Sequence, residues 1–204
     1  MTTSEPKQAR AHATRLRLLD AAVEELLDRG YAGLTTPGVA NRAGVSRGAQ
    51  QNYFPRKATL VAAAVRHLAT RQLDELREQL ADVPVGSERV RAGLDVLYDQ
   101  YSGRLFAAVV ELALASRADT ELQQVIQAEE RTIAETMRTT AAVIFGEGFP
   151  ATRDEAARWG TLLSAIRGIA LLNLLGHSQA GVNRQWQASR EHLVALLETR
   201  SDRA

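Results

Sequence analysis

A short segment in the first third of the chain carries polar side chains of the kind that read base pairs. Ser46 is followed by Arg47, Gln50, Gln51, Asn52 and Tyr53. Serine is a preferred N-cap, so Ser46 predicts a helix over about 47–53. Guanidinium and amide groups each place two hydrogen-bonding atoms where one base edge can meet both. The segment is too polar to fill a core, and we expect one of its faces to contact DNA.

The elements before this segment complete the layout of a helix-turn-helix. Thr36 precedes Pro37, and this pair predicts a helix start capped by the threonine hydroxyl. Gly44 supplies the backbone freedom that ends this helix and turns the chain steeply into the next one.

Flanking helices are expected on both sides of the motif. Apolar residues recur every three or four positions over about 13–28, and Gly30 follows as a stop. A long helix is expected over 57–80, and residues 1–11, which lack an apolar period, are expected to form a mobile arm.

The rest of the chain predicts helices only. Breaks at 82–87 and 146–150 separate segments expected to be helical over about 87–101, 104–116, 119–145, 152–175 and 183–199. The expected fold is all-α with about nine helices. We expect an arm at 1–11, a DNA-binding domain at 12–57 and a larger effector-binding and dimerisation domain at 58–204.

Composition excludes several classes of protein. The chain has no cysteine, which excludes disulfides, thiolate metal sites and cysteine nucleophiles, and we expect neither a metal nor a cofactor. No secretory signal is evident, and the longest apolar stretch is too short for a membrane span, so a soluble, cytoplasmic protein is expected. Residues 1–57 hold 9 Lys/Arg against 5 Asp/Glu, a basic balance that suits phosphate binding.

The first 65 or so residues resemble the DNA-binding domain of TetR-type transcriptional regulators. The resemblance rests on Arg15–Ala22, Gly30-Tyr31, Thr35-Thr36, Val39-Ala40, Ala43–Ser46 and Tyr53-Phe54-Pro55-x-Lys57, at the spacings of that family. It implies a homodimer that places two copies of the 47–53 helix in successive major grooves of double-stranded DNA. It also implies a C-terminal domain that binds a small-molecule effector.

Eight residues are the expected DNA contacts: Thr36, Arg47, Gly48, Ala49, Gln51, Asn52, Tyr53 and Lys57. Each has a plainer alternative, such as a solvated arginine at Arg47 or packing on Phe54 for Tyr53. Gln50 stands where relatives bury an aliphatic residue, and it either packs its stem or reaches a base edge.

The effector and dimer sites are expected in the larger domain and its linking helix. Candidate effector contacts are His67, Tyr98, Tyr101, Phe106, Glu111, Arg167 and Asn173, whose alternatives are ordinary core or surface positions. Glu111 lies in an apolar run, so it either faces solvent, pairs with an arginine or anchors a cationic ligand. Candidate dimerisation residues are Leu162, Ile166, Ile169, Ala170, Trp186, Leu193, Leu196 and Leu197, and the alternative is a helix hairpin that closes the protomer's own core.

The leading hypothesis is therefore a ligand-responsive transcriptional repressor. A helical adaptor that binds protein rather than DNA is the alternative. An enzyme is not expected, because the histidines are scattered and no metalloprotease, phosphate-loop or nucleophile-elbow motif occurs.

Overall fold

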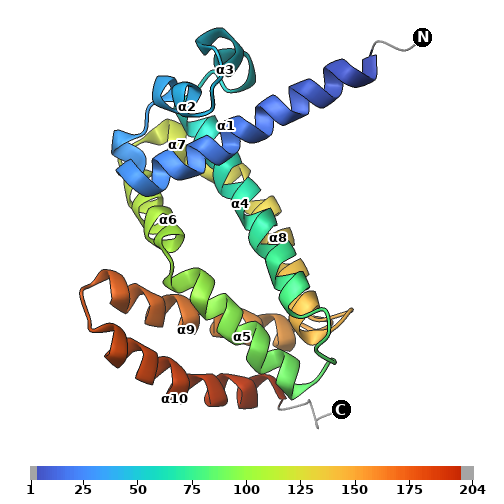
Figure 1. Ribbon diagram of the computed structural model, residues 1–204. Helices are drawn as coiled ribbons and strands as arrows, with labels where there is room; N and C mark the ends of the chain where they lie inside the picture. The colour runs from blue at the N-terminus through green and yellow to red at the C-terminus, as the bar shows by residue number, and fades with distance from the viewer. Residues whose placement is uncertain (1–3, 199–204) are drawn as a thin grey trace. The chain divides into compact units, whose positions relative to one another are not determined.

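The computed structural model describes residues 4–198, and every regular element in that range is a helix. The helices are α1 (Ser4–Gly33), α2 (Thr36–Arg42), α3 (Arg47–Tyr53), α4 (Lys57–Gln79), α5 (Ser87–Ser102), α6 (Arg104–Ala115), α7 (Thr120–Ala128), α8 (Glu130–Phe145), α9 (Arg153–Leu174) and α10 (Gln179–Glu198) (Figure 1). The expected all-helical class is confirmed, and the described range holds ten helices where about nine were expected. None of them is both long and apolar enough to cross a membrane.

The extra helix comes from a break in the segment expected to be one helix over 119–145. At Glu129 the backbone N–H donates to the carbonyl of Ile126, three residues earlier, and α8 starts at the next residue. Arg66 donates to both carboxylate oxygens of Glu129, each at 2.6 Å. No glycine or proline marks the break, so its position depends on a tertiary contact that the local sequence does not reveal.

The N-terminal segment also differs from expectation. α1 begins at Ser4, so residues 4–11 are helical and not a mobile arm; residues 1–3 lie outside the described range. Lys7 to Ala11 are good helix formers, and Pro6 lies in the first turn, where a missing N–H costs little. Extending an existing helix is favourable without an apolar stripe, which is why the missing period misled the prediction.

The chain divides into two compact units, each built from two chain segments. The first unit is Met1–Thr70 with Ala107–Ile133, and the second is Arg71–Phe106 with Ala134–Ala204. This division differs from the expected boundary at residue 57, because the first turns of α4 belong to the first unit's core. Leu60, Val61 and Ala64 of α4 are buried there with Leu18 of α1 and Leu122 of α7.

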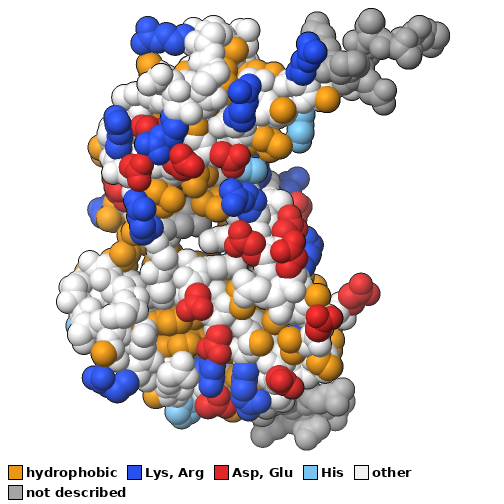
Figure 2. Space-filling model, in the orientation of Figure 1, with side chains coloured by type: hydrophobic (Ala, Val, Ile, Leu, Met, Phe, Trp, Pro, Cys, Tyr) orange, Lys and Arg blue, Asp and Glu red, His pale blue; other side chains and the backbone are white. Residues whose placement is uncertain are grey.

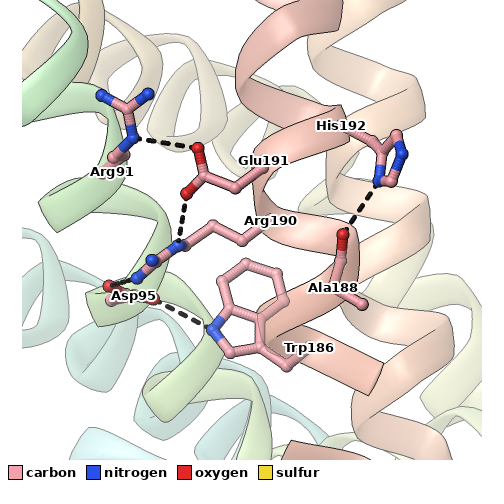
Figure 3. Close-up of polar contacts among 7 residues, drawn as sticks. All are labelled: Arg91, Asp95, Trp186, Ala188, Arg190, Glu191 and His192. Carbon is pink, nitrogen blue, oxygen red and sulfur yellow. Dashed lines mark hydrogen bonds and ion pairs between the residues drawn. The ribbon is translucent and has the colours of Figure 1, made fainter. Parts of the chain in front are cut away.

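The second unit is built around α5, α9 and α10. The rings of Tyr98 and Trp186 stack with their centroids 4.5 Å apart. The indole N–H of Trp186 donates to Asp95 at 2.9 Å, and Arg190 pairs with the other oxygen of the same carboxylate (Figure 3). A polar network thus holds α10 on α5 beside an apolar core.

Candidate nucleic-acid interface

The reader helix α3 is set up by its cap and by the turn before it. The hydroxyl oxygen of Ser46 accepts from the N–H of Ala49 at 3.2 Å, as the sequence predicts. Gly44 has φ 62°, a conformation that glycine adopts without the steric cost other residues would pay. The turn therefore fixes the direction in which α3 leaves α2.

The preceding helix is capped one residue earlier than expected. Thr35, not Thr36, is the N-cap of α2, and its Oγ1 accepts from the N–H of Gly38 at 3.1 Å. Pro37 is then the second residue of the helix, where its missing N–H still has no intrahelical partner to lose. Thr36 is half-buried and makes no cap contact, so its hydroxyl is left for another acceptor or donor.

One face of α3 is open to solvent. Arg47, Gly48, Gln51 and Asn52 are all exposed. A Cβ added at Gly48 would meet no atom within 4 Å, so nothing in the protomer obstructs an approach to the helix there. Ala49 and Tyr53 are half-buried, and Tyr53 packs against the core of the first unit. The exposed set is the polar face that the sequence predicts.

The two alternatives for Gln50 are resolved in favour of packing. Its side chain is 5% exposed, and its Nε2 donates to the carbonyl of Phe54 at 2.6 Å. That carbonyl belongs to the C-cap of α3, where carbonyl groups lack intrahelical donors. Gln50 therefore ends the reader helix from inside and does not reach a base edge.

Lys57 lies at the start of α4 with its ammonium engaged inside the first unit. The nitrogen is 4.2 Å from the centroid of the Tyr31 ring and 3.5 Å from the carbonyl oxygen of Ala32. Burial lowers the pKa of Lys57, although the Asp119 carboxylate acts in the opposite sense. The first turn of α4 is thus positively charged and tied to the end of α1.

Tyr31 connects the end of α1 to α6 and α7. Its N–H donates to Oε1 of Glu111 at 3.2 Å, and its hydroxyl donates to Asp119 at 3.1 Å. Gly30 has φ 64°, and a Cβ there would collide with the Glu111 carboxylate. Burial raises the pKa of Tyr31 to about 12, and the hydrogen bond to Asp119 acts in the same direction.

Of the alternatives for Glu111, the structure matches the one in which it faces solvent. Glu111 is exposed and accepts from the backbone N–H of Tyr31 rather than from an arginine. It belongs to the first unit and not to the helices of the second.

Arg42 holds α2 against α1. Its guanidinium pairs with Glu24 at 3.2 Å, with Glu25 at 2.9 Å and with Asp28 at 2.9 Å. Glu25 is 3% exposed, so the arginine neutralises a carboxylate that is nearly out of water. Sequence reasoning missed this residue, because three carboxylates on one helix face say nothing about the angle at which the next helix meets it.

A second missed signal is visible in the sequence. From Arg29 to Leu73 the chain has no aspartate or glutamate, while it has Arg42, Arg47, Arg56 and Lys57. On the face drawn in Figure 2, no acidic side chain shows over α3, and acidic groups appear only further from it. The local potential around the reader helix is therefore more positive than the net charge of +1 indicates.

The candidate effector residues do not form one group. Tyr101, Phe106 and Arg167 are brought together in the second unit: the Tyr101 and Phe106 rings meet edge to face at 5.3 Å, and Arg167 donates to the Tyr101 hydroxyl at 3.0 Å. His67 lies in the first unit, with its Nε2 2.9 Å from Asp20. Tyr98 is buried in the stack with Trp186, so it is a core residue. Asn173 is half-buried, and both atoms of its amide lack a partner among the described residues.

The candidate dimerisation residues are mostly inside the protomer. Those that are buried in the core of the second unit are Leu162, Ile166, Ile169, Ala170, Trp186 and Leu193, while Leu196 and Leu197 are half-buried. The dimer assignment stays a prediction for all eight residues, and six of them contribute to the protomer's own core. For them the structure matches the alternative, in which α9 and α10 close the protomer's own core. The helical periodicity of the sequence correctly predicted an apolar face on α9 and α10. It did not predict whether helices of the same protomer or of a second copy pack against that face.

Comparisons with known proteins find transcriptional regulators. A sequence profile described as "Bacterial regulatory proteins, tetR family" matches residues 18–64, which include α2 and α3. An HTH-type transcriptional regulator from Mycobacterium bovis is 32% identical over 121 residues, which is 59% of this chain and 62% of that protein. The HTH-type transcriptional regulator CymR from Pseudomonas putida is 29% identical over 168 residues, 81% of each chain.

Residues 18–64 form a domain of the tetR family.

Solved structures share the fold of this chain along most of its length. A tetR-family regulator from Mesorhizobium loti covers 92% of the chain with a TM-score of 0.68 and 18% identity. FadR from Bacillus subtilis, solved in complex with stearoyl-CoA, covers 90% with a TM-score of 0.64 and 18% identity. The expected resemblance is confirmed, and the helical region after the matched profile is part of the shared fold. The match to the Mycobacterium bovis protein spans less than two thirds of that protein's length.

Proposed function

We propose that the chain is a sequence-specific DNA-binding transcriptional regulator, and that it acts as a homodimeric, ligand-responsive repressor in the cytoplasm. The observation that carries this proposal is the exposed polar face of α3, held by the Ser46 cap and the internal hydrogen bond of Gln50. A buried face would indicate packing, whereas this face is open where a major groove must enter. The names of the relatives support the same function.

The proposed base contacts lie on α3. Arg47 in the first turn donates to a guanine edge or to a phosphate, and the amide of Gln51 pairs with adenine. Asn52 supplies a second amide. Gly48 and Ala49 have small side chains, which allow the helix to approach the base pairs closely. The Ala49 methyl group can then contact the methyl group of a thymine.

The proposed backbone contacts frame the reader helix. Thr36 and the Tyr53 hydroxyl contact phosphates, which fix the register of the protein without reading sequence. Lys57 contributes charge at the start of α4, where unsatisfied N–H groups also favour an anion. Because the Lys57 ammonium lies against Tyr31, it contributes to DNA binding mainly by long-range electrostatic attraction and not by direct contact.

A second copy of the chain is proposed to bind on the exposed side of α9, opposite its buried side. Gly160, Ser164 and Gly168 are exposed, and a Cβ added at either glycine would meet nothing within 4 Å. Leu171, Leu174 and Leu175 continue this side with exposed fractions of 37%, 43% and 66%. Small residues allow close approach and exposed leucines supply apolar area, which is a suitable combination for a symmetric helix-to-helix interface.

DNA binding by the purified protein tests this function. The DNA upstream of the gene and a random duplex of equal length are titrated by fluorescence anisotropy across a salt series. We expect a clear preference for the upstream DNA and an affinity that falls steeply with salt. Arg47→Ala should abolish the preference, whereas Arg117→Ala, which removes an exposed arginine after α6, should keep it.

The alternative function predicts different results. A helical adaptor that binds protein would show no salt-dependent duplex binding, and Arg47→Ala would leave its activity unchanged. Equal binding to upstream and random DNA would exclude autoregulation, and a selection from random duplexes would then identify the operator. No cluster of three metal-ligating residues occurs among residues 4–198.

A further inference from the structure

Arg167, in the C-terminal half of α9, is a half-buried cation with neutral partners. Its Nη2 donates to the hydroxyl of Tyr101 at 3.0 Å and to the sulfur of Met137 at 3.8 Å. The guanidinium carbon is 5.2 Å from the centroid of the Tyr101 ring. No carboxylate pairs with it among the described side chains, and its Nε and Nη1 have no hydrogen-bond partner there.

Other half-buried arginines of the second unit are satisfied differently. Arg91 pairs with Glu191 and Arg190 pairs with Asp95, so each faces a negative charge (Figure 3). Arg89 donates to the backbone carbonyls of Leu80, Val83 and Val143. Arg167 differs from these arginines, because its Nε and Nη1 keep N–H donors that neither a carboxylate nor a backbone carbonyl of the described residues occupies.

The surroundings of Arg167 are suited to a small organic molecule. Tyr101 and Phe106 offer two rings at right angles, and the thioether of Met137 adapts to irregular apolar shapes. Ser102, next to Tyr101, has a buried hydroxyl without a partner, and Asn173 has a buried amide without one. α5 and α9 pack against each other, and Ser102 and Asn173 each lie near the C-terminal end of one of these two helices.

We propose that the effector of this regulator is an organic monocarboxylate with an apolar or aromatic body, bound through Arg167. The carboxylate accepts from the N–H groups of Nε and Nη1, a charge-assisted contact that a guanidinium makes strongly. One guanidinium with no second cation in the cluster matches a single negative charge better than a phosphate dianion. The apolar body lies against Tyr101, Phe106 and Met137. This inference rests on the proposed regulatory function, since it names the ligand of that function.

Calorimetric titration of the full-length protein tests the ligand class without using DNA. Sodium benzoate and sodium octanoate are the probes, and benzamide and benzylamine are the neutral and cationic counterparts of benzoate. We expect at least one carboxylate to bind, and to bind about tenfold or more tightly than either counterpart. Arg167→Gln should weaken that binding by about 10- to 100-fold, because a charge-assisted hydrogen bond is lost. Arg91→Gln, which removes a cation already paired with Glu191, should leave it unchanged.

Thermal unfolding without ligand separates a binding role from a structural one. Arg167→Gln should unfold at the wild-type temperature or above it, because it removes a cation without a counterion. Arg190→Gln should unfold at a lower temperature, because it leaves Asp95 without its partner. If Arg167→Gln is destabilised as much as Arg190→Gln, the residue is structural and the proposal is overturned.

Two further results would overturn the proposal: no binding by either carboxylate, or binding that Arg167→Gln leaves intact. Anisotropy with upstream DNA on the same preparation reports the regulatory function independently. A protein that prefers its operator but ignores both carboxylates retains the proposed function and loses only the ligand class.

Discussion

Two adjacent glutamines show how differently neighbouring residues can act. Gln50 is buried and donates to the Phe54 carbonyl, whereas Gln51, turned by about 100° around α3, is exposed. We expect Gln50→Ala to lower the free energy of unfolding by about 1–3 kcal/mol, since a carbonyl loses its donor and a cavity forms. We expect Gln51→Ala to change it by less than about 0.5 kcal/mol. Urea unfolding of both variants measures this difference.

DNA binding should reverse the order of the two variants. Gln51→Ala should lose about 1–3 kcal/mol of discrimination at one operator position, visible when each base pair is varied in turn. Gln50→Ala should keep the base preference of the wild type at temperatures where it is folded. A change of base preference in Gln50→Ala alone would mean that the buried glutamine, not the exposed one, reads DNA.

At the scale of elements, the local sequence predicted a helix boundary only where nearby residues determine that boundary. The bounds of α3 follow from Ser46 and from Phe54-Pro55, because caps and breakers act within a few residues. The break at Glu129, the Arg42 contacts with α1 and the hydrogen bonds of Tyr31 depend on helices distant in sequence. The predicted N-cap of α2, Thr36, is one residue away from the observed N-cap, Thr35, because two adjacent threonines offer the same hydroxyl group.

The joint between α6 and α7 depends on the charge of Asp119. The N–H of Leu122 donates to this carboxylate and lowers its pKa, and the Tyr31 hydroxyl adds to the effect. A carboxyl whose pKa is lower in the folded state stabilises the fold above its unfolded pKa, about 3.9, and loses that contribution as pH falls through the folded value. We expect Asp119→Asn, which keeps a capping side chain, to be less stable than wild type near pH 7. The difference in stability between wild type and Asp119→Asn should narrow below about pH 4. Urea unfolding midpoints of both proteins, measured across this pH range, test this. A difference that stays constant with pH would mean that the charge of Asp119 does not contribute to stability.

At the scale of the whole molecule, the sequence located the apolar side of α9 but did not show that this side packs within the protomer. Leu162, Ile166 and Ile169 fill the protomer's own core, which leaves the side with Gly160, Ser164 and Gly168 for a partner. Apolar period alone cannot separate these cases, because an intramolecular core and a dimer interface present the same pattern.

The two sides of α9 give opposite predictions for assembly. Ser164→Arg places a long cation on the proposed interface without touching the core, so we expect a folded monomer in analytical ultracentrifugation, with Ser164→Ala still dimeric. Loss of the dimer should weaken binding to a full operator by about 100-fold or more, because the second half-site is no longer held nearby. Binding of Ser164→Arg to a single half-site should be unchanged.

Ile166→Ala should instead lower the free energy of unfolding by about 2–4 kcal/mol, since its cavity lies inside the protomer. A Ser164→Arg variant that stays dimeric would place the interface elsewhere on the molecule.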